Sequence, residues 1–187
     1  MLIKITGWPR LGFLKTLFPD ALLVHVVRDG RAQVNTMLGK DFWKGWQGPD
    51  NWRWGALTPE QERLWHSHDR SFVALAAINW NLLLDAFQAT REHVEPADLI
   101  EVRYEDFAVE PTAVVRRIAD AAGLSCSTSF ERQVKSIGVR ERSHWLTDLT
   151  EEQQDVLCAC LSAEHMERYG YWTRNSDPPA HSALAGE

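Results

Sequence analysis

The chain has 187 residues, of which 44% are hydrophobic and 25% are charged, so it is long enough for one globular domain with a substantial core. It carries 20 Lys and Arg against 26 Asp and Glu, and this net charge of −6 argues against broad, sequence-independent binding to nucleic acid. Its three cysteines are too few for a disulfide framework and lack the second ligand pair of a zinc site.

Two further classes of protein are disfavoured. No apolar run approaches the roughly 20 residues that span a bilayer, and the first residues lack the order of a signal peptide. We therefore expect a cytoplasmic protein with reduced thiols and no bound metal.

The first part of the chain alternates apolar runs with helical patterns. Residues 2–5 form a short apolar run before a turn, which predicts a strand. Residues 10–18 have apolar side chains at the spacing of one helical face. The nearly continuous apolar run 21–27 is typical of a central parallel strand covered on both faces. A tight turn and a helix over 32–38 follow.

The remaining chain repeats the order of strand and helix, which indicates an α/β fold. Residues 39–59 predict a long loop or lid, and helical patterns resume over 59–93. A strand over 99–104 precedes a helix over 111–122, which Gly123 ends. After a polar segment through residue 145, a capping box predicts one helix over 150–168. We expect a single domain over 1–172 and a disordered tail over 173–187.

Arg28 is the first candidate for chemistry. In an open α/β sheet, ligands bind beyond the carboxyl ends of the strands, where Arg28 lies if residues 21–27 form a central strand. A guanidinium holds phosphate through two parallel hydrogen bonds, and the helix that follows adds its N-terminal amides. Thr36, eight residues later, can turn its hydroxyl toward the same anion. The alternative is that Arg28 pairs with Asp29 and that Thr36 faces solvent.

The segment Phe18-Pro19-Asp20-Ala21 through Val27-Arg28-Asp29-Gly30-Arg31-Ala32 to Thr36 resembles the 3′-phosphate-binding segment of sulfotransferases. In that family an arginine at the strand end and a serine eight residues on hold the 3′-phosphate of the donor 3′-phosphoadenosine 5′-phosphosulfate (PAPS). Arg28 matches the arginine, and Thr36 keeps the hydroxyl of the serine. We expect Gly30 and Arg31 to serve the same phosphate.

Two further stretches are similar to the family: residues 102–107, which contain a Tyr-Glu-Asp motif, and Arg142-Ser143-His144-Trp145. The resemblance implies a helix-rich, parallel-sheet, three-layer sandwich of the P-loop NTPase-like type. It makes Tyr104 a candidate contact of the adenine, and Arg140 and Arg142 candidate contacts of the 3′-phosphate, with Arg142 preferred. The alternatives are an ordinary strand tyrosine and a solvated loop.

Lys4 is similar in position to the lysine that precedes the acceptor-side loop in cytosolic sulfotransferases, where it can stabilise charge on the bridging oxygen. The histidine base of those enzymes would fall near Thr6, which cannot abstract a proton at neutral pH, so no base is assigned. We interpret His66 and His68 as surface histidines on a helix.

Nothing before Lys4 matches the strand, glycine-containing loop and helix that cradle the donor's 5′-phosphosulfate in the family. We therefore expect an N-terminally truncated domain that keeps the C-terminal two-thirds of the fold. Loss of a central strand exposes apolar sheet edge, which predicts marginal stability or self-association.

The function that this resemblance implies is sulfuryl transfer from PAPS to a hydroxyl or amine of a small molecule, lipid or carbohydrate, without a metal. The alternatives are a noncatalytic nucleotide-binding module or truncated remnant and, less favoured, a nucleotide kinase of the related phosphate-loop class. Six tryptophans between residues 43 and 80 form either an acceptor wall or a helix-packing core with a sealed lid.

Overall fold

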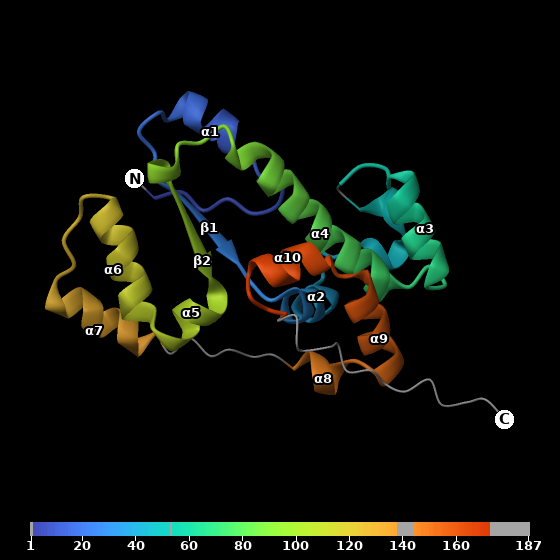
Figure 1. Ribbon diagram of the computed structural model, residues 1–187. Helices are drawn as coiled ribbons and strands as arrows, with labels where there is room; N and C mark the ends of the chain where they lie inside the picture. Colours follow the sequence, from blue (N-terminus) through green and yellow to red (C-terminus); the bar gives the residue numbers. More distant parts are fainter. Residues whose placement is uncertain (1, 53, 138–143, 173–187) are drawn as a thin grey trace.

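The computed structural model describes residues 2–52, 54–137 and 144–172, and over these residues the protein is a helix-rich α/β structure built on a small parallel sheet (Figure 1). The elements in chain order are α1 Leu11–Leu17, β1 Leu23–Val27, α2 Gly30–Leu38, the 3₁₀ turns η1 Gly45–Gln47 and η2 Pro49–Asn51, α3 Pro59–Ser67, α4 Phe72–Arg91, η3 Pro96–Asp98, β2 Leu99–Arg103, α5 Tyr104–Val109, α6 Pro111–Ala121, α7 Thr128–Ser136, α8 Trp145–Asp148, α9 Glu151–Cys160 and α10 Ala163–Arg168.

Strands β1 and β2 pair in parallel, with Leu23 opposite Leu99 and Val27 opposite Arg103. Both strands therefore end at the same edge of the sheet, and their next residues leave that edge side by side. The predictions of a strand at 21–27, of a second strand near 99–104 and of a parallel α/β arrangement are confirmed.

The two faces of this sheet differ. On one face Val27 is buried and the ring of Phe87 from α4 stacks on His25, with 3.6 Å between ring centroids. The other face is the side on which α5 and α6 lie (Figure 1). On this face Val102 of β2 is only 3% exposed, whereas Val26 of β1 is 59% exposed. Among the residues that the structure describes, the three-layer arrangement is thus present over β2 only.

Two strand predictions need correction. Residues 21–27 do not form a strand covered on both faces, because no element among the described residues covers Val24 and Val26. Residues 2–5 do not form a strand, because they pair with neither β1 nor β2, and an extended segment needs a neighbour to bond its amides and carbonyls. Lys4 therefore lies in an unpaired, exposed segment before α1.

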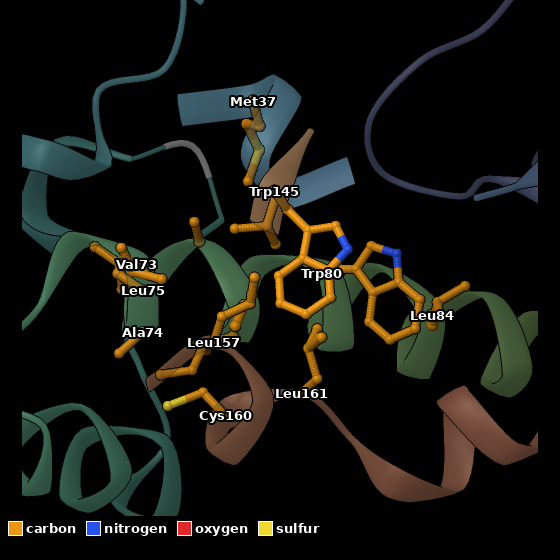
Figure 2. Packing of buried hydrophobic residues seen from close by; sticks show 14 of the residues in the cluster. Met37, Val73, Ala74, Leu75, Trp80, Leu84, Trp145, Leu157, Cys160 and Leu161 are labelled. Atoms are coloured by element: carbon orange, nitrogen blue, oxygen red, sulfur yellow. The ribbon is translucent and has the colours of Figure 1, made fainter. Parts of the chain in front are cut away.

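Helix α4 lies at the centre of the largest core cluster. Its side chains pack against α2 and α8 on one side and against α9 on the other, with Leu157 fully buried among them (Figure 2). Contrary to the expectation from the sequence, α4 is long and apolar enough to cross a membrane by length and composition alone. However, 61% of that apolar window is buried inside the protein, which accounts for its composition as that of a core helix.

Most of the clustered tryptophans belong to this core. Trp43, Trp52 and Trp80 are buried, and Trp54 and Trp65 are partly buried against the same cluster. The interpretation of Trp65 and Trp80 as helix-packing core is therefore confirmed. Trp46 is the exception among the six, because it is 61% exposed.

The C-terminal part contains one predicted capping box and one unpredicted break. Thr150 and Gln153 form the capping box that opens α9. The helix then ends at Cys160 instead of continuing to residue 168, because Asn81 of α4 donates to the Cys160 carbonyl at 2.8 Å and accepts from the Ser162 amide at 2.9 Å. These bonds satisfy the backbone groups that the break leaves open.

The open face of β1 predicts self-association. We expect Val26→Thr, which keeps the β-branched shape but lowers the apolar area, to weaken self-association about fivefold in analytical ultracentrifugation. Val109→Thr on α5 is the matched control, since Val109 is also a solvent-exposed valine but belongs to a helix and not to the sheet. Equal association of the two variants would show that the open face is not the contact surface.

Candidate functional site

Arg28, Thr36 and Tyr104 lie together at the carboxyl edge of the sheet. Arg28 follows the last residue of β1 and Tyr104 follows the last residue of β2, which are paired in register. The Nη1 atom of Arg28 donates to Thr36 Oγ1 at 3.0 Å, and the guanidinium lies over the Tyr104 ring, 5.0 Å from its centroid. The structure thus brings together three predicted site residues that come from a strand end and two helices.

Asp29 is paired with Arg31. Its carboxylate caps α2 by accepting from the Arg31 amide at 2.9 Å, and it accepts again from Arg31 Nη2 at 2.6 Å. The alternative in which Thr36 faces solvent is wrong, because Thr36 accepts a hydrogen bond from Arg28. Arg28 is directed to Thr36 instead.

Arg31 is a structural residue, which corrects its assignment to the phosphate. Its guanidinium lies 5.3 Å from the centre of the Trp145 ring and donates to the Tyr171 carbonyl at 3.3 Å. Burial lowers the pKa of Arg31, but the hydrogen bond and charge of Asp29 outweigh it and raise that pKa overall. Arg31 therefore joins the start of α2 to the C-terminal part of the domain.

Gly30 likewise has a packing role. A Cβ atom at this position would lie 2.8 Å from Leu161 Cδ2 and 3.2 Å from the Trp80 ring. Only glycine allows the first turn of α2 to approach α4 and the segment after α9 this closely. The packing of Gly30 thus fixes where α2 starts, and with it the place of Thr36.

Glu105 is a site residue that the sequence did not single out. Its carboxylate accepts from the Asp29 amide at 3.0 Å and from the Tyr171 hydroxyl at 2.7 Å. Burial and the bond to Glu105 raise the pKa of Tyr171, so the hydroxyl remains a donor. Glu105 stands next to Tyr104 in the Tyr-Glu-Asp motif, and its function here is to hold the turn that carries Arg28.

The sulfotransferase family model matches residues 6–128. The chain belongs to the sulfotransferase family. No curated protein and no solved structure gives a significant match to it. The matched range contains Arg28, Thr36, Tyr104 and Glu105, so the whole cluster lies in the part of the chain that defines the family.

Lys4 is a predicted residue of the sulfotransferase site that does not join this cluster among the described residues. Lys4 is exposed, and no hydrogen bond or ion pair links it to Arg28, Thr36 or Tyr104 within the described residues. Arg140 and Arg142 lie outside the described residues. Of the two histidines, His66 is exposed and His68 is partly exposed at the end of α3, as expected for surface positions.

A second polar cluster supports the same sheet from the α4 side. Glu101 of β2 accepts from Arg91 at 2.6 Å and from the Tyr169 hydroxyl at 2.9 Å, and Nδ1 of His25 in β1 lies 3.7 Å from Glu101 Oε2. His25 lowers the pKa of Glu101 most, burial opposes this, and Tyr169 and Arg91 lower it further, to about 2. This carboxylate links β1, β2 and α4 below the Arg28 site.

Gly30→Ala should destabilise the domain by about 1–3 kcal/mol, because the added methyl group overpacks a closed contact. Urea unfolding followed by circular dichroism measures this loss. Gly12→Ala in α1 is the matched control, since nothing lies within 4 Å of a Cβ there. The packing role of Gly30 is contradicted if both variants unfold at the same urea concentration.

The Glu101 cluster predicts a loss of stability in acid. The pKa of Glu101 in the folded protein, about 2, lies below the ordinary value of 4.5. The contribution of its carboxylate to stability is therefore complete above about pH 4.5 and disappears as the pH falls toward 2. Glu101→Gln removes this contribution, and its unfolding free energy should therefore fall less than that of the parent between pH 5 and pH 3. Glu92→Gln, at the exposed end of α4, should retain the parent's slope. Parallel slopes for parent and Glu101→Gln would rule out this carboxylate as the source.

Proposed function

We propose that this sulfotransferase uses PAPS as donor, that Arg28 and Thr36 bind the donor's 3′-phosphate, and that the sulfuryl group passes to a hydroxyl or amine acceptor. The observation that carries the proposal is the 3.0 Å bond between Arg28 Nη1 and Thr36 Oγ1. Two donors that touch each other in this way are within reach of the oxygens of one phosphate.

The environment of Arg28 supports anion binding. Asp29, the nearest carboxylate in sequence, is engaged by Arg31 and by the start of α2. The positive end of α2 begins two residues after Arg28, and its dipole favours an anion beside it. A phosphate in this position would receive the Arg28 guanidinium and the Thr36 hydroxyl together.

Tyr104 supports the assignment of the rest of the nucleotide. Its ring lies under the Arg28 guanidinium, so an adenosine whose 3′-phosphate meets Arg28 would have an aromatic surface beside it. Tyr104 would border the adenine, and the positively charged side chain of Arg140 or Arg142 would contact the 3′-phosphate. Lys4 would stabilise charge on the bridging oxygen during transfer.

The transfer itself needs in-line positioning and charge stabilisation more than covalent participation of the protein. The donor's sulfur–oxygen bond to the 5′-phosphate breaks, a bond from sulfur to the acceptor oxygen or nitrogen forms, and the acceptor's proton leaves to a base. The cluster of Arg28, Thr36 and Tyr104 consists of binding groups. For this reason a noncatalytic nucleotide-binding module is the second candidate function.

Calorimetric binding of 3′-phosphoadenosine 5′-phosphate (PAP) to the purified chain tests the donor site. We expect PAP to bind more tightly than adenosine 5′-phosphate, and Arg28→Ala to weaken PAP binding by about tenfold or more, because hydrogen bonds to charged groups are among the strongest. Arg63→Ala is the matched control, since Arg63 is an exposed arginine on α3 that pairs with Glu60. Its affinity for PAP should equal that of the parent.

The binding results test the donor site, and a transfer assay then separates the two candidate functions. Equal binding of PAP and adenosine 5′-phosphate by folded protein, or equal affinity of Arg28→Ala and parent, would rule out a 3′-phosphate site at Arg28. If PAP binds selectively, incubation with PAPS and a panel of hydroxyl and amine acceptors separates the transferase from the binding module. Release of PAP that depends on an acceptor identifies the transferase.

A further inference from the structure

Tyr171, in the segment after α10, is bonded to both sides of the turn that follows Arg28. Its hydroxyl donates to Glu105 Oε2 at 2.7 Å, and its carbonyl accepts from Arg31 Nη2 at 3.3 Å. Each of these partners also holds Asp29: Glu105 accepts from the Asp29 amide at 3.0 Å, and Arg31 pairs with the Asp29 carboxylate at 2.6 Å. Asp29, Arg31, Glu105 and Tyr171 therefore form a closed network of hydrogen bonds.

The end of α10 directs Tyr171 toward this network. The Gly170 amide donates to the Glu167 carbonyl at 2.9 Å, and the Tyr171 amide donates to the Met166 carbonyl at 2.8 Å. These two bonds, with a φ of 68° at Gly170, are the pattern of a Schellman motif. Glycine adopts this left-handed conformation without a steric penalty, so the chain reverses its direction within one residue.

The aromatic ring of Tyr171 lies against the end of β2. The guanidinium of Arg103 lies over this ring, 4.8 Å from its centroid. Arg103 is the last residue of β2 and pairs in register with Val27, the residue before Arg28. The phenol is thus anchored at the end of the sheet from which Arg28 leaves, and only its hydroxyl bond reaches Glu105.

The bond between Glu105 and the Asp29 amide bears directly on Arg28. The Asp29 nitrogen belongs to the planar peptide group that joins Arg28 to Asp29. A fixed Asp29 amide therefore restricts rotation about the Cα–C bond of Arg28, which sets the direction in which its side chain leaves the strand. The Arg28 side chain is long, so a small rotation at its Cα atom would move the guanidinium away from Thr36 Oγ1, which it reaches at 3.0 Å.

We propose that Tyr171 is a positioning residue for binding of the 3′-phosphate: its hydroxyl holds Glu105, Glu105 holds the Asp29 amide, and this amide fixes the orientation of Arg28. The proposal rests on the proposed function and extends its donor site to a residue beyond the range 6–128 that the family model matches. Because a carboxylate is the acceptor and both side chains are half-buried, the bond is of the stronger, charge-assisted kind.

The test compares the full chain with Tyr171→Phe in calorimetric binding of PAP and of adenosine 5′-phosphate. Phenylalanine keeps an aromatic ring for Arg103 and removes only the hydroxyl. We expect PAP to bind about fivefold more weakly to the variant and adenosine 5′-phosphate to bind as it does to the parent. A general loss of folded protein would weaken both nucleotides by the same factor, so the ratio of the two affinities isolates the effect on the 3′-phosphate.

Tyr169→Phe is the matched control, since it removes the same group two residues earlier. The Tyr169 hydroxyl donates to Glu101 at 2.9 Å, and this carboxylate keeps its bond from Arg91 at 2.6 Å in the variant. We expect Tyr169→Phe to unfold at a lower urea concentration than the parent and to keep the parent's preference for PAP. If both variants lose this preference equally, Tyr171 has no specific positioning role.

Two further measurements follow the effect along the network. Without nucleotide, hydrogen exchange of the Asp29 amide, followed by NMR, should be faster in Tyr171→Phe than in the parent and in Tyr169→Phe. In a double-mutant cycle, Tyr171→Phe should weaken PAP binding little further once Glu105→Ala is present, because the two residues act in series. Circular dichroism establishes that each variant is folded.

The outcomes separate the two proposals. If the parent prefers PAP and Tyr171→Phe prefers it equally, or if the losses of Tyr171→Phe and Glu105→Ala simply add, the positioning role is wrong and the donor site stands. If the folded parent does not distinguish PAP from adenosine 5′-phosphate, the proposed function fails. The role of Tyr171 in phosphate binding then fails with it, even where exchange of the Asp29 amide is faster in Tyr171→Phe.

Discussion

Parallel pairing of β1 with β2 is the constraint on which the candidate site depends. Because Val27 stands opposite Arg103, the next residues of the two strands, Arg28 and Tyr104, leave the sheet at the same edge. A slip of one residue in this register would turn the two side chains to opposite faces. The contact of the guanidinium with the tyrosine ring is thus a consequence of strand pairing, and not of any local preference of either residue.

The register in turn depends on what holds the two strands against the helices. Below the edge, Glu101 connects β2 to Arg91 of α4 and lies close to His25 of β1. At the edge, Glu105 accepts from the Asp29 amide and so joins the start of α5 to the turn after β1. Glu101 and Glu105 therefore fix β1 relative to β2 at two positions along the strands. This leaves little freedom for the turn that carries Arg28.

The different roles of Arg28 and Arg31 follow from the same geometry. Arg31 lies in the first turn of α2, where its side chain meets the capping carboxylate of Asp29 and the ring of Trp145. Arg28 precedes the cap and reaches along the helix to Thr36. The sequence predicted that both arginines serve the phosphate, and the structural role of Arg31 appears only once the cap and the close packing at Gly30 are in place.

The parts of the fold that the sequence predicted are those with local causes. The strand 21–27, the helix after it, the stop at Gly123 and the capping box at Thr150 each depend on neighbours within one or two turns, and each is present. Arg28 could be chosen because ligands bind beyond the strand ends of an open α/β sheet, whereas Tyr104 was chosen only from the resemblance to sulfotransferases.

The failures have causes distant in the sequence. An apolar run does not say which of its faces another element covers, so the exposure of Val26 could not be read from residues 21–27. The break after Cys160 is made by Asn81, which lies in another helix. Helix α7 is a different case, since Ser127 caps it and apolar residues recur at Phe130, Val134 and Ile137, a pattern visible in the sequence but obscured by the polar residues between them.

These observations connect the unusual tryptophan content to the site. The cluster centred on Trp80 packs α4 against α2, and that packing requires the glycine at position 30. At the other end of α2 the chain turns back over Trp43, whose buried ring accepts the close approach of Gly45. An indole ring thus meets the glycine that starts α2, and a second indole meets a glycine in the turn that follows the helix. Trp46, in the 3₁₀ turn η1, has no such role in packing and is left exposed.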